Sequence, residues 1–404
     1  MTSTEQAPLQ TLRLRRGEER RLRSGHLWIY SNEVDIEKTP LKGLTPGVEV
    51  VVEDHRGKAL GRAYANPQSL ICARLFSRDA HQPLAGRLLK ERIGQAIAFR
   101  DRLFAEPCYR AVFGEGDGLP GLVIDRYQDL FVIQSGTAGM ERVQDAVAEV
   151  LVSQHGARTV VARNESSIRE LEGLDAYTRA LHGDMPETVT LVENGVRYAA
   201  PLASGQKTGW FYDHRAARRQ SMPLAKDARV LDVFSYCGAW GVLAATQGAT
   251  DVTCLDASET ALDFVHENAR ANNVADKVRT LHADAFAGMK ELANTGEKFD
   301  VVVLDPPAFI KRRKDMKNGL AGYHAINELA VRLVAPGGVL ISASCSMHLP
   351  TAQLLDVVRA SARHIDRFAQ VFAQAGQAED HPQHPAIPET AYLKSCFTRI
   401  LPSL

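Results

Sequence analysis

The C-terminal half of the chain alternates short apolar runs with longer stretches in which apolar residues recur at helical spacing. The apolar runs are candidate strands, and they lie at residues 229–233, 251–255, 277–281, 300–304 and 338–344. Strands that alternate with helices form a parallel sheet that helices cover on both faces. The pattern therefore predicts an α/β, Rossmann-like domain in this half.

The N-terminal half has a different pattern, in which β-prone runs come first and helices follow. Three runs separated by Gly and Pro turn signals predict a β-rich module, at residues 48–52, 59–64 and 71–75. Beyond them we expect a helix, a β-hairpin, a second helix and a strand, at residues 84–105, 121–125 with 130–134, 141–154 and 159–162. Another hairpin is expected at residues 188–191 and 197–200.

Domain boundaries are placed where the pattern changes and the chain turns polar. The prediction is a β-rich domain at residues 1–78, a small central α+β domain at 79–184 and the α/β domain at 185–404. A length of 404 residues agrees with two or three domains of roughly 150 residues each.

Charge and cysteine content narrow the class of protein. The net charge is zero, so any nucleic-acid-binding surface must be local. The six cysteines show no zinc-finger or C-x-x-C spacing, and we expect reduced thiols and no metal site. The N-terminal residues lack the apolar run of a signal peptide, and no apolar run reaches about 18 residues. These observations predict a cytoplasmic protein without a membrane span.

Two clusters of basic residues are candidates for local contact with RNA phosphates. The first precedes the β-rich module and contains Arg13, Arg15, Arg16, Arg20, Arg21 and Arg23. The second follows the sequence Asp305-Pro306-Pro307 and contains Lys311, Arg312, Arg313 and Lys314. Such clusters are also typical of a solvated charged face. Near the second cluster, Phe309 and Tyr323 are candidates to stack on an RNA base.

The glycine-rich segment at residues 114–121 is not expected to be a phosphate loop. It contains two acids, and it leads into a strand rather than a helix. We interpret it as part of the central domain.

Four acidic residues each lie at the carboxyl end of a candidate strand of the α/β domain: Asp232, Asp256, Asp284 and Asp305. Ligands of open α/β sheets bind beyond the carboxyl ends of the strands. Asp256 is 24 residues beyond Asp232, which suits a carboxylate that accepts hydrogen bonds from both ribose hydroxyls. Asp284 is placed to accept from an adenine amino group. Four acids in succession are less readily explained as simple caps of strand–helix junctions.

The loop after the first strand lacks the G-x-G-x-x-G sequence of dinucleotide-binding sites. Phe234 and Tyr236 stand where glycines would be expected, and Gly238 is kept. A backbone with such side chains cannot approach a diphosphate closely, so the loop suits a cofactor without phosphate.

This arrangement of acids resembles the class I S-adenosylmethionine-dependent methyltransferases. The resemblance covers about residues 200–350 and ends in an Asp-Pro-Pro after the fourth strand. It implies that Asp232 lies near the methionine end of the cofactor, Asp256 at the ribose and Asp284 at the adenine. The residues expected to bind the cofactor in this part are Asp232, Phe234, Tyr236, Gly238, Asp256, Ala257, Asp284, Ala285 and Asp305.

Two sequences suggest different chemistries. Asp305-Pro306-Pro307 with Phe309 resembles the motif of N-methyltransferases, in which a rigid turn holds an exocyclic amine. Cys345 ends the fifth strand, and a thiolate there would add to C6 of a pyrimidine and make C5 nucleophilic. Cys237 is a second choice for the thiol, and Cys254 is expected to be core.

Longer stretches resemble the RlmI-type ribosomal RNA large subunit methyltransferases, which form 5-methylcytosine in 23S rRNA. The segments are SGQKTGWFYDHR at 204–215, the FSYCG loop, LDPPAF, SCS and the YLK tail at 392–394. The resemblance implies a PUA domain, a central domain and a methyltransferase domain. It also implies that Cys345 is the nucleophile and that Gln206 and Lys207 bind the cofactor. The sequence departs from the family at Cys237 and Trp240, where small residues are expected.

The resulting hypothesis is methylation of cytosine C5 in large-subunit ribosomal RNA, with Cys345 and Asp305 catalytic and Asp305 a candidate base for the C5 proton. Two alternatives stay open: an N-methyltransferase of RNA or protein that uses Asp-Pro-Pro, and a non-catalytic RNA-binding or assembly factor. The modified nucleotide and the oligomeric state are also open, and a homodimer is one possibility.

Overall fold

The computed structural model describes residues 9–203, 205 and 208–403, so Gln206 and Lys207 lie outside the described residues. The chain forms two compact units. The N-terminal unit consists of Met1–Glu187, Leu202–Trp210 and Asp380–Thr390. The C-terminal unit consists of Thr188–Pro201, Phe211–Glu379 and Ala391–Leu404.

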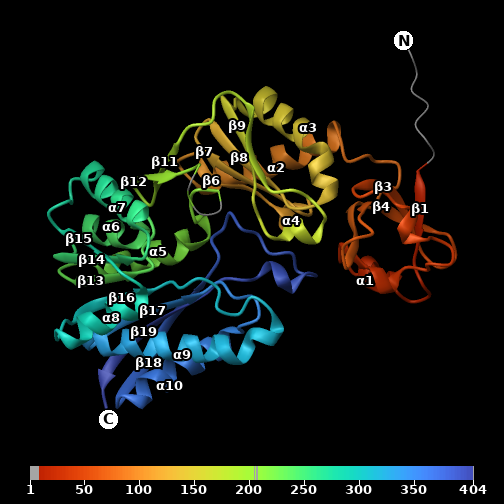
Figure 1. The fold of residues 1–404 in the computed structure, drawn as a ribbon. Helices are drawn as coiled ribbons and strands as arrows, with labels where there is room; N and C mark the ends of the chain where they lie inside the picture. Colours follow the sequence, from red (N-terminus) through yellow and green to blue (C-terminus); the bar gives the residue numbers. More distant parts are fainter. Residues whose placement is uncertain (1–8, 204, 206–207, 404) are drawn as a thin grey trace. The chain divides into compact units, whose positions relative to one another are not determined.

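The N-terminal unit begins with a five-stranded sheet of order β1-β3-β4-β5-β2 (red in Figure 1). Its strands are β1 (Gln10–Arg13), β2 (Trp28–Tyr30), β3 (Val48–Glu53), β4 (Ala59–Ala65) and β5 (Ile71–Ser77), with the short helix α1 (Glu19–Arg23) between β1 and β2. Leu12, Ile29 and Val50 are fully buried in its core. The three predicted strands are confirmed, whereas β1 and β2 were not predicted because they are short and adjoin arginine-rich segments.

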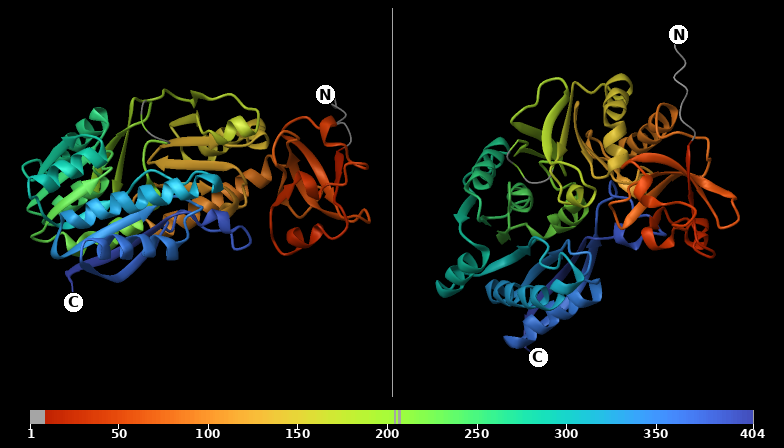
Figure 2. Two further views of the ribbon diagram at one scale, coloured as in Figure 1. Left: turned by 60° about the horizontal axis from the view of Figure 1, so that its bottom comes forward. Right: turned by 45° about the vertical axis from the view of Figure 1, so that its right-hand side comes forward.

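A second five-stranded sheet in the same unit has the order β10-β9-β8-β7-β6 (orange to yellow-green in Figure 2). Its strands are β6 (Cys108–Phe113), β7 (Leu122–Tyr127), β8 (Leu130–Ser135), β9 (Thr159–Asn164) and β10 (Tyr177–His182). Helices α2 (Arg87–Leu103) and α3 (Ala138–His155) pack on it, and the small helix α4 (Ile168–Leu171) follows β9. The predicted helices, the hairpin β7–β8 and the strand β9 are confirmed; β6 and β10 were missed.

The C-terminal unit contains a seven-stranded sheet of order β15-β14-β13-β16-β17-β19-β18. Its strands are β13 (Arg229–Val233), β14 (Asp251–Asp256), β15 (Val278–His282), β16 (Phe299–Leu304), β17 (Val334–Ser344), β18 (Arg367–Gly376) and β19 (Lys394–Pro402). The first five are parallel, as predicted. Strands β18 and β19 were not predicted; β19 lies between β17 and β18 and is antiparallel to both.

Helices cover both faces of this sheet (Figure 1). One layer consists of α5 (Arg215–Ser221), α6 (Ala239–Thr246) and α7 (Glu259–Ala271). The other consists of α8 (Ala285–Asn294), α9 (Met316–Leu333) and α10 (Thr351–His364). The predicted hairpin β11 (Thr188–Glu193) and β12 (Val196–Pro201) turns at Asn194 and Gly195, whose φ angles of 50° and 80° suit a tight two-residue turn.

Among the described residues, no helix is long and apolar enough to cross a membrane.

Candidate active site

The order of the seven-stranded sheet reverses between β13 and β16, which are hydrogen-bonded neighbours. Ligands of such sheets bind beyond the carboxyl ends of the strands at this reversal. Asp232 is the penultimate residue of β13, Asp256 ends β14, and Asp284 and Asp305 closely follow β15 and β16. The fold therefore brings the four predicted acids to one edge of the sheet.

The loop between β13 and α6 takes a glycine-like path although it has two aromatic residues. Phe234, Tyr236 and Gly238 have φ angles of 64°, 48° and 78°. The left-handed conformation is unfavourable for residues with a Cβ, by roughly 1–2 kcal/mol each, and such strain is concentrated at functional sites. The amide N–H groups of Phe234 and Ser235 donate to the Leu255 carbonyl at 2.9 and 3.1 Å, which fixes the loop against β14.

Asp232 is the most perturbed acid at this edge. It is fully buried, and its Oδ2 accepts the Gly241 N–H at 2.9 Å. Gly241 permits this approach, because a Cβ there would lie 2.5 Å from Cys254 Sγ. Within the described part of the chain, Asp232 Oδ1 and Ser235 Oγ have no hydrogen-bond partner. Burial, opposed by the Gly241 hydrogen bond, raises the pKa of Asp232 to about 7.

The unpaired Asp232 oxygen fits the positively charged amino group at the methionine end of S-adenosylmethionine. A buried polar atom without a hydrogen-bond partner lowers the stability of the folded protein, and a bound ligand that pairs with the atom removes this cost. Asp256 holds the loop after β13 close to the end of β14. Its two oxygens accept the backbone N–H groups of Tyr236 and Ser258, each at 2.9 Å. Ala257, which follows Asp256, is exposed.

Asp284 caps helix α8, since its Oδ1 accepts the N–H groups of Phe286 and Ala287 at 3.0 and 3.2 Å. The residue is nevertheless exposed at the same edge. Ala285 is buried and belongs with Met289 to the core of the unit.

Asp305 has a partner that the sequence did not reveal. His214 Nε2 lies 3.1 Å from Asp305 Oδ1, with the side chains 5% and 20% exposed. Burial alone lowers the pKa of His214, but the charge and hydrogen bond of Asp305, with the charge of Asp213, outweigh it and raise the pKa. The His214 ring also contacts Trp240 edge-on at 5.8 Å between ring centres. His214 thus holds and orients the Asp305 carboxylate.

Cys345 directly follows β17, and Asp305 directly follows the neighbouring strand β16. Leu304 of β16 is the register partner of Ser342 of β17, so the two strands end close together and Cys345 lies beside the start of the Asp305 turn. It is partly exposed, whereas the other cysteines are buried. The hydroxyl of Tyr323 hydrogen-bonds to both Ser344 Oγ and Ser346 Oγ at 2.8 Å, which fixes the residues on either side of Cys345.

The prediction that Tyr323 stacks on an RNA base is wrong. Its side chain is fully buried and contacts the Phe309 ring at 4.9 Å between ring centres. The sequence could not show this, because the partners of Tyr323 come from β17 and from the turn after β16.

Lys394 lies close to Cys345 on the neighbouring strand. It begins β19 and is the register partner of Ser344. Its Nζ donates to the Ser346 and Leu349 carbonyls at 2.6 and 2.7 Å, so the ammonium is held beside the turn that contains Cys345. Burial lowers the pKa of Lys394 to about 8, although the nearby Cys345 opposes this shift. An ammonium in this position stabilises a thiolate.

The other cysteines do not fit the role of nucleophile. Burial raises the pKa of Cys237 and of Cys254, the second of which is core as expected. In the described ranges, no group of His, Cys, Asp and Glu side chains could hold a metal ion.

The basic clusters differ in how far they are neutralised. Arg13, Arg21 and Arg23 pair with Glu53, Glu33 and Asp54 at 2.6, 3.0 and 2.8 Å. In the second cluster Arg312 pairs with Asp315 at 3.2 Å. The remaining three arginines of the first cluster, and all four residues of the second, are exposed: Arg15, Arg16, Arg20, Lys311, Arg312, Arg313 and Lys314.

The strand order, the acids at the reversal and the unpaired buried carboxylate define a class I S-adenosylmethionine-dependent methyltransferase. Comparison with family models agrees. Residues 153–399 match an S-adenosylmethionine-dependent methyltransferase family, and residues 12–78 match a PUA-like domain.

Curated relatives specify the family. The chain is 36% identical over 394 residues to the ribosomal RNA large subunit methyltransferase I of Aliivibrio fischeri (strain MJ11), covering 96% of this chain and 98% of the relative. It is 35% identical to the enzyme of that name from Photobacterium profundum, covering 95% and 98%. The chain belongs to the ribosomal RNA large subunit methyltransferase I family.

Solved structures show the same fold over nearly the whole chain. A crystal structure of the methyltransferase SMU.776 complexed with SAH has a TM-score of 0.82 at 19% identity, covering 97% of this chain and 100% of that one. A methyltransferase from Streptococcus mutans has a TM-score of 0.81 with the same identity and coverage.

Proposed function

We propose that the protein methylates C5 of a cytosine in the 23S rRNA of the large ribosomal subunit, with Cys345 as the covalent nucleophile. The observation that carries the mechanism is Cys345 itself, a partly exposed thiol at a strand end that adjoins the Asp305 turn. The names of the relatives and the PUA-like match support an RNA substrate.

S-adenosylmethionine, when bound, would supply the electrophilic methyl group carried by its sulfonium sulfur. Asp232, with its unpaired Oδ1, would bind the amino group, and the carboxylates of Asp256 and Asp284 would bind the ribose and the adenine. Phe234, Tyr236 and Gly238 form the loop that the cofactor packs against. The exposed basic residues Lys311–Lys314 contact phosphates of the RNA near the reacting base.

The Cys345 thiolate adds to C6 of the cytosine, and the π electron pair of the C5=C6 double bond moves to C5. C5 then bonds to the methyl carbon as the bond between that carbon and the sulfonium sulfur breaks, and a base removes the C5 proton while the carbon–sulfur bond to Cys345 breaks. Asp305 is that base, and His214 is a positioning residue that holds its carboxylate at 3.1 Å. The products are 5-methylcytosine, S-adenosylhomocysteine and a proton.

Lys394 supports the first step. Its ammonium is anchored by the Ser346 and Leu349 carbonyls, and a cation held there favours the thiolate form of the nucleophile. Tyr323 fixes Ser344 and Ser346, so the thiol between them is held in place for attack.

The decisive experiment traps the covalent adduct. RNA carrying 5-fluorocytosine at the target should bind the wild-type enzyme irreversibly, because fluorine cannot leave as a proton does, and the adduct should contain the transferred methyl group. Cys345→Ala should form no adduct and should not methylate, while it still binds S-adenosylmethionine. Cys237→Ala serves as the control and should still form the adduct. Near-normal activity of Cys345→Ala would instead favour an N-methyltransferase that uses Asp305-Pro306-Pro307.

A further inference from the structure

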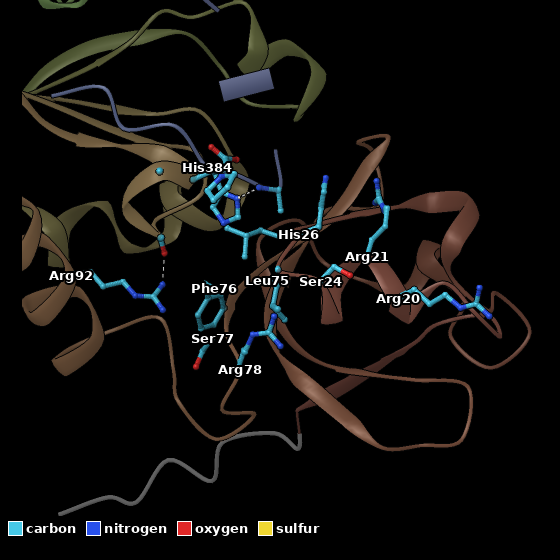
Figure 3. A pocket seen from close by; sticks show the side chains of 17 residues that line it. Arg20, Arg21, Ser24, His26, Leu75, Phe76, Ser77, Arg78, Arg92 and His384 are labelled. Carbon is cyan, nitrogen blue, oxygen red and sulfur yellow. Dashed lines mark hydrogen bonds between the residues drawn. The ribbon is translucent and has the colours of Figure 1, made fainter. Parts of the chain in front are cut away.

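The N-terminal unit has a pocket of about 970 Å³ that arginines line (Figure 3). Arg20 and Arg21 of the first basic cluster lie on its wall with Arg78 and Arg92. The pocket therefore extends a surface that the sequence already marks as a candidate for RNA contact. The C-terminal unit holds a feature that the sequence did not mark, where the hairpin β11–β12 meets helix α7.

Strand β12 lies against helices α6 and α7 (Figure 1), and two asparagine side chains bind its edge. In an antiparallel pair every second residue turns its N–H and C=O away from the partner strand. Asn272, the C-cap of α7, accepts the Arg197 N–H at 3.1 Å and donates to the Arg197 carbonyl at 2.7 Å. Asn268 accepts the Ala199 N–H at 2.7 Å and donates to the Ala199 carbonyl at 3.0 Å. The two amide side chains thus take the place of a third strand.

The spacing of the two elements permits this match. Alternate residues of a strand are about 6.6 Å apart, and residues four apart in a helix are about 6 Å apart along the axis. Asparagine is a poor residue for the interior of a helix, and Asn268 is buried on the face of α7 that carries Leu262 and Val265. Its amide group is tolerated there because backbone groups pair with both the oxygen and the nitrogen.

Asn268 also reaches the loop between β13 and α6. Its Nδ2 donates to the Cys237 carbonyl at 2.9 Å. The Tyr198 hydroxyl of β12 donates to the Ala239 carbonyl at 3.1 Å. These two carbonyls lie on either side of Gly238, which caps α6 in the left-handed conformation with a φ of 78°. The backbone at Gly238 is therefore held from both sides by groups outside the loop.

The same loop contains the left-handed residues Phe234 and Tyr236. Residues with a Cβ favour other conformations, so the loop keeps this path only where contacts with its surroundings outweigh the cost. The Leu255 carbonyl holds the beginning of the loop. Asn268 and Tyr198 hold its end, so the conformation of the loop depends on α7 and on the hairpin.

We propose that Asn268 and Tyr198 are positioning residues of the cofactor site, which hold the loop after β13 in the conformation that binds S-adenosylmethionine. The hairpin β11–β12 is then a support of this site, because β12 carries Tyr198 and orients the Asn268 amide. Both side chains act through the loop backbone and not by touching the cofactor. The inference deepens the proposed function, since it assumes that this loop contacts the cofactor.

The test compares Asn268→Ala with Asn272→Ala in the full 404-residue chain. Each replacement removes three hydrogen bonds, two of them to β12, but only Asn268→Ala removes a bond to the loop. The Kd for S-adenosylmethionine, measured by calorimetry, should rise on the order of tenfold in Asn268→Ala, because a loop that is less often in the binding conformation binds more weakly. The Kd of Asn272→Ala should stay within about twofold of the wild-type value.

Two further measurements separate positioning from a general loss of stability. The Gly238 amide donates to the Ser235 carbonyl at 2.8 Å, and its hydrogen exchange should be faster in Asn268→Ala but not in Asn272→Ala. At saturating S-adenosylmethionine the methylation rate of Asn268→Ala should approach that of the wild type, because a defect in cofactor binding raises KM for the cofactor and leaves kcat unchanged.

Equal S-adenosylmethionine affinities of the two alanine variants would overturn the proposal. If Asn268→Ala does not fold, Tyr198→Phe replaces it, because this change removes only a hydroxyl. Its Kd should rise roughly threefold or more, and an unchanged Kd would overturn the proposal equally. A wild type that binds S-adenosylmethionine but does not methylate rRNA would refute the proposed function alone, because the measurement that decides this inference is cofactor binding.

Discussion

Replacing Lys394 by methionine tests how Cys345 is activated. Methionine has nearly the shape of the lysine side chain but lacks the ammonium, which is held by the Ser346 and Leu349 carbonyls beside the thiol. For a cation and a thiolate held side by side near a protein surface, with an effective dielectric constant of about 20, the attraction is on the order of 2–4 kcal/mol. This corresponds to about 2 pKa units, and solvent near the partly exposed thiol reduces it. We expect the thiol pKa to rise by about 1–2 units in Lys394→Met.

The assay is the rate of alkylation of Cys345 by iodoacetamide as a function of pH, with the modified peptide identified by mass spectrometry. At a pH below the thiol pKa of both proteins, a rise of about 1–2 units reduces the thiolate fraction roughly 10- to 100-fold, but a more basic thiolate is also more nucleophilic. The net rate should therefore fall roughly three- to tenfold. The other cysteines are buried and should react slowly.

The charge and the packing of Lys394 are separated by a second variant. Lys394→Arg keeps a cation and should keep the thiol pKa within about half a unit of the wild-type value, even if its unfolding temperature falls. Lys394→Met should also be less stable, because two carbonyls lose a charged donor that contributes about 1.5–3 kcal/mol each. An alkylation profile of folded Lys394→Met that coincides with the wild-type profile would refute the electrostatic role.

Two further predictions concern the cofactor. Asp256→Ala should weaken S-adenosylmethionine binding by roughly 1–3 kcal/mol, because two ribose hydroxyls lose their acceptor; unchanged affinity in calorimetry would exclude this role. Asp232 has its pKa raised to about 7, and it must ionise to pair with the cofactor amino group, so affinity should increase as pH rises through about 7. In the free protein the folded state then binds the proton more tightly than the unfolded state, and stability should fall as pH rises from about 4 to 7. Asp232→Asn should remove both pH dependences, as measured by calorimetry and by thermal unfolding.

The sequence of the loop after β13 predicts the kind of cofactor correctly but does not predict the backbone conformation of the loop. Phe234 and Tyr236 occupy positions where the backbone has a glycine-like φ, so the geometry of a glycine-rich loop is reached without its glycines. The aromatic side chains were correctly taken as evidence against a diphosphate. The strained backbone could not be predicted, because it depends on hydrogen bonds to Leu255 on the neighbouring strand.

The sequence alone determined the alternation of strands and helices, the acids at the strand ends and the identity of the candidate nucleophile. These features are local, because hydrophobic period and chain direction decide which residues end a strand. The tertiary structure decided the pairing of His214 with Asp305 and of Lys394 with the carbonyl of Ser346, 48 residues away. It also placed the antiparallel β19 beside β17, which brings Lys394 to Cys345. Periodicity shows which face of a strand is buried, but only packing of the whole sheet selects the neighbouring strand.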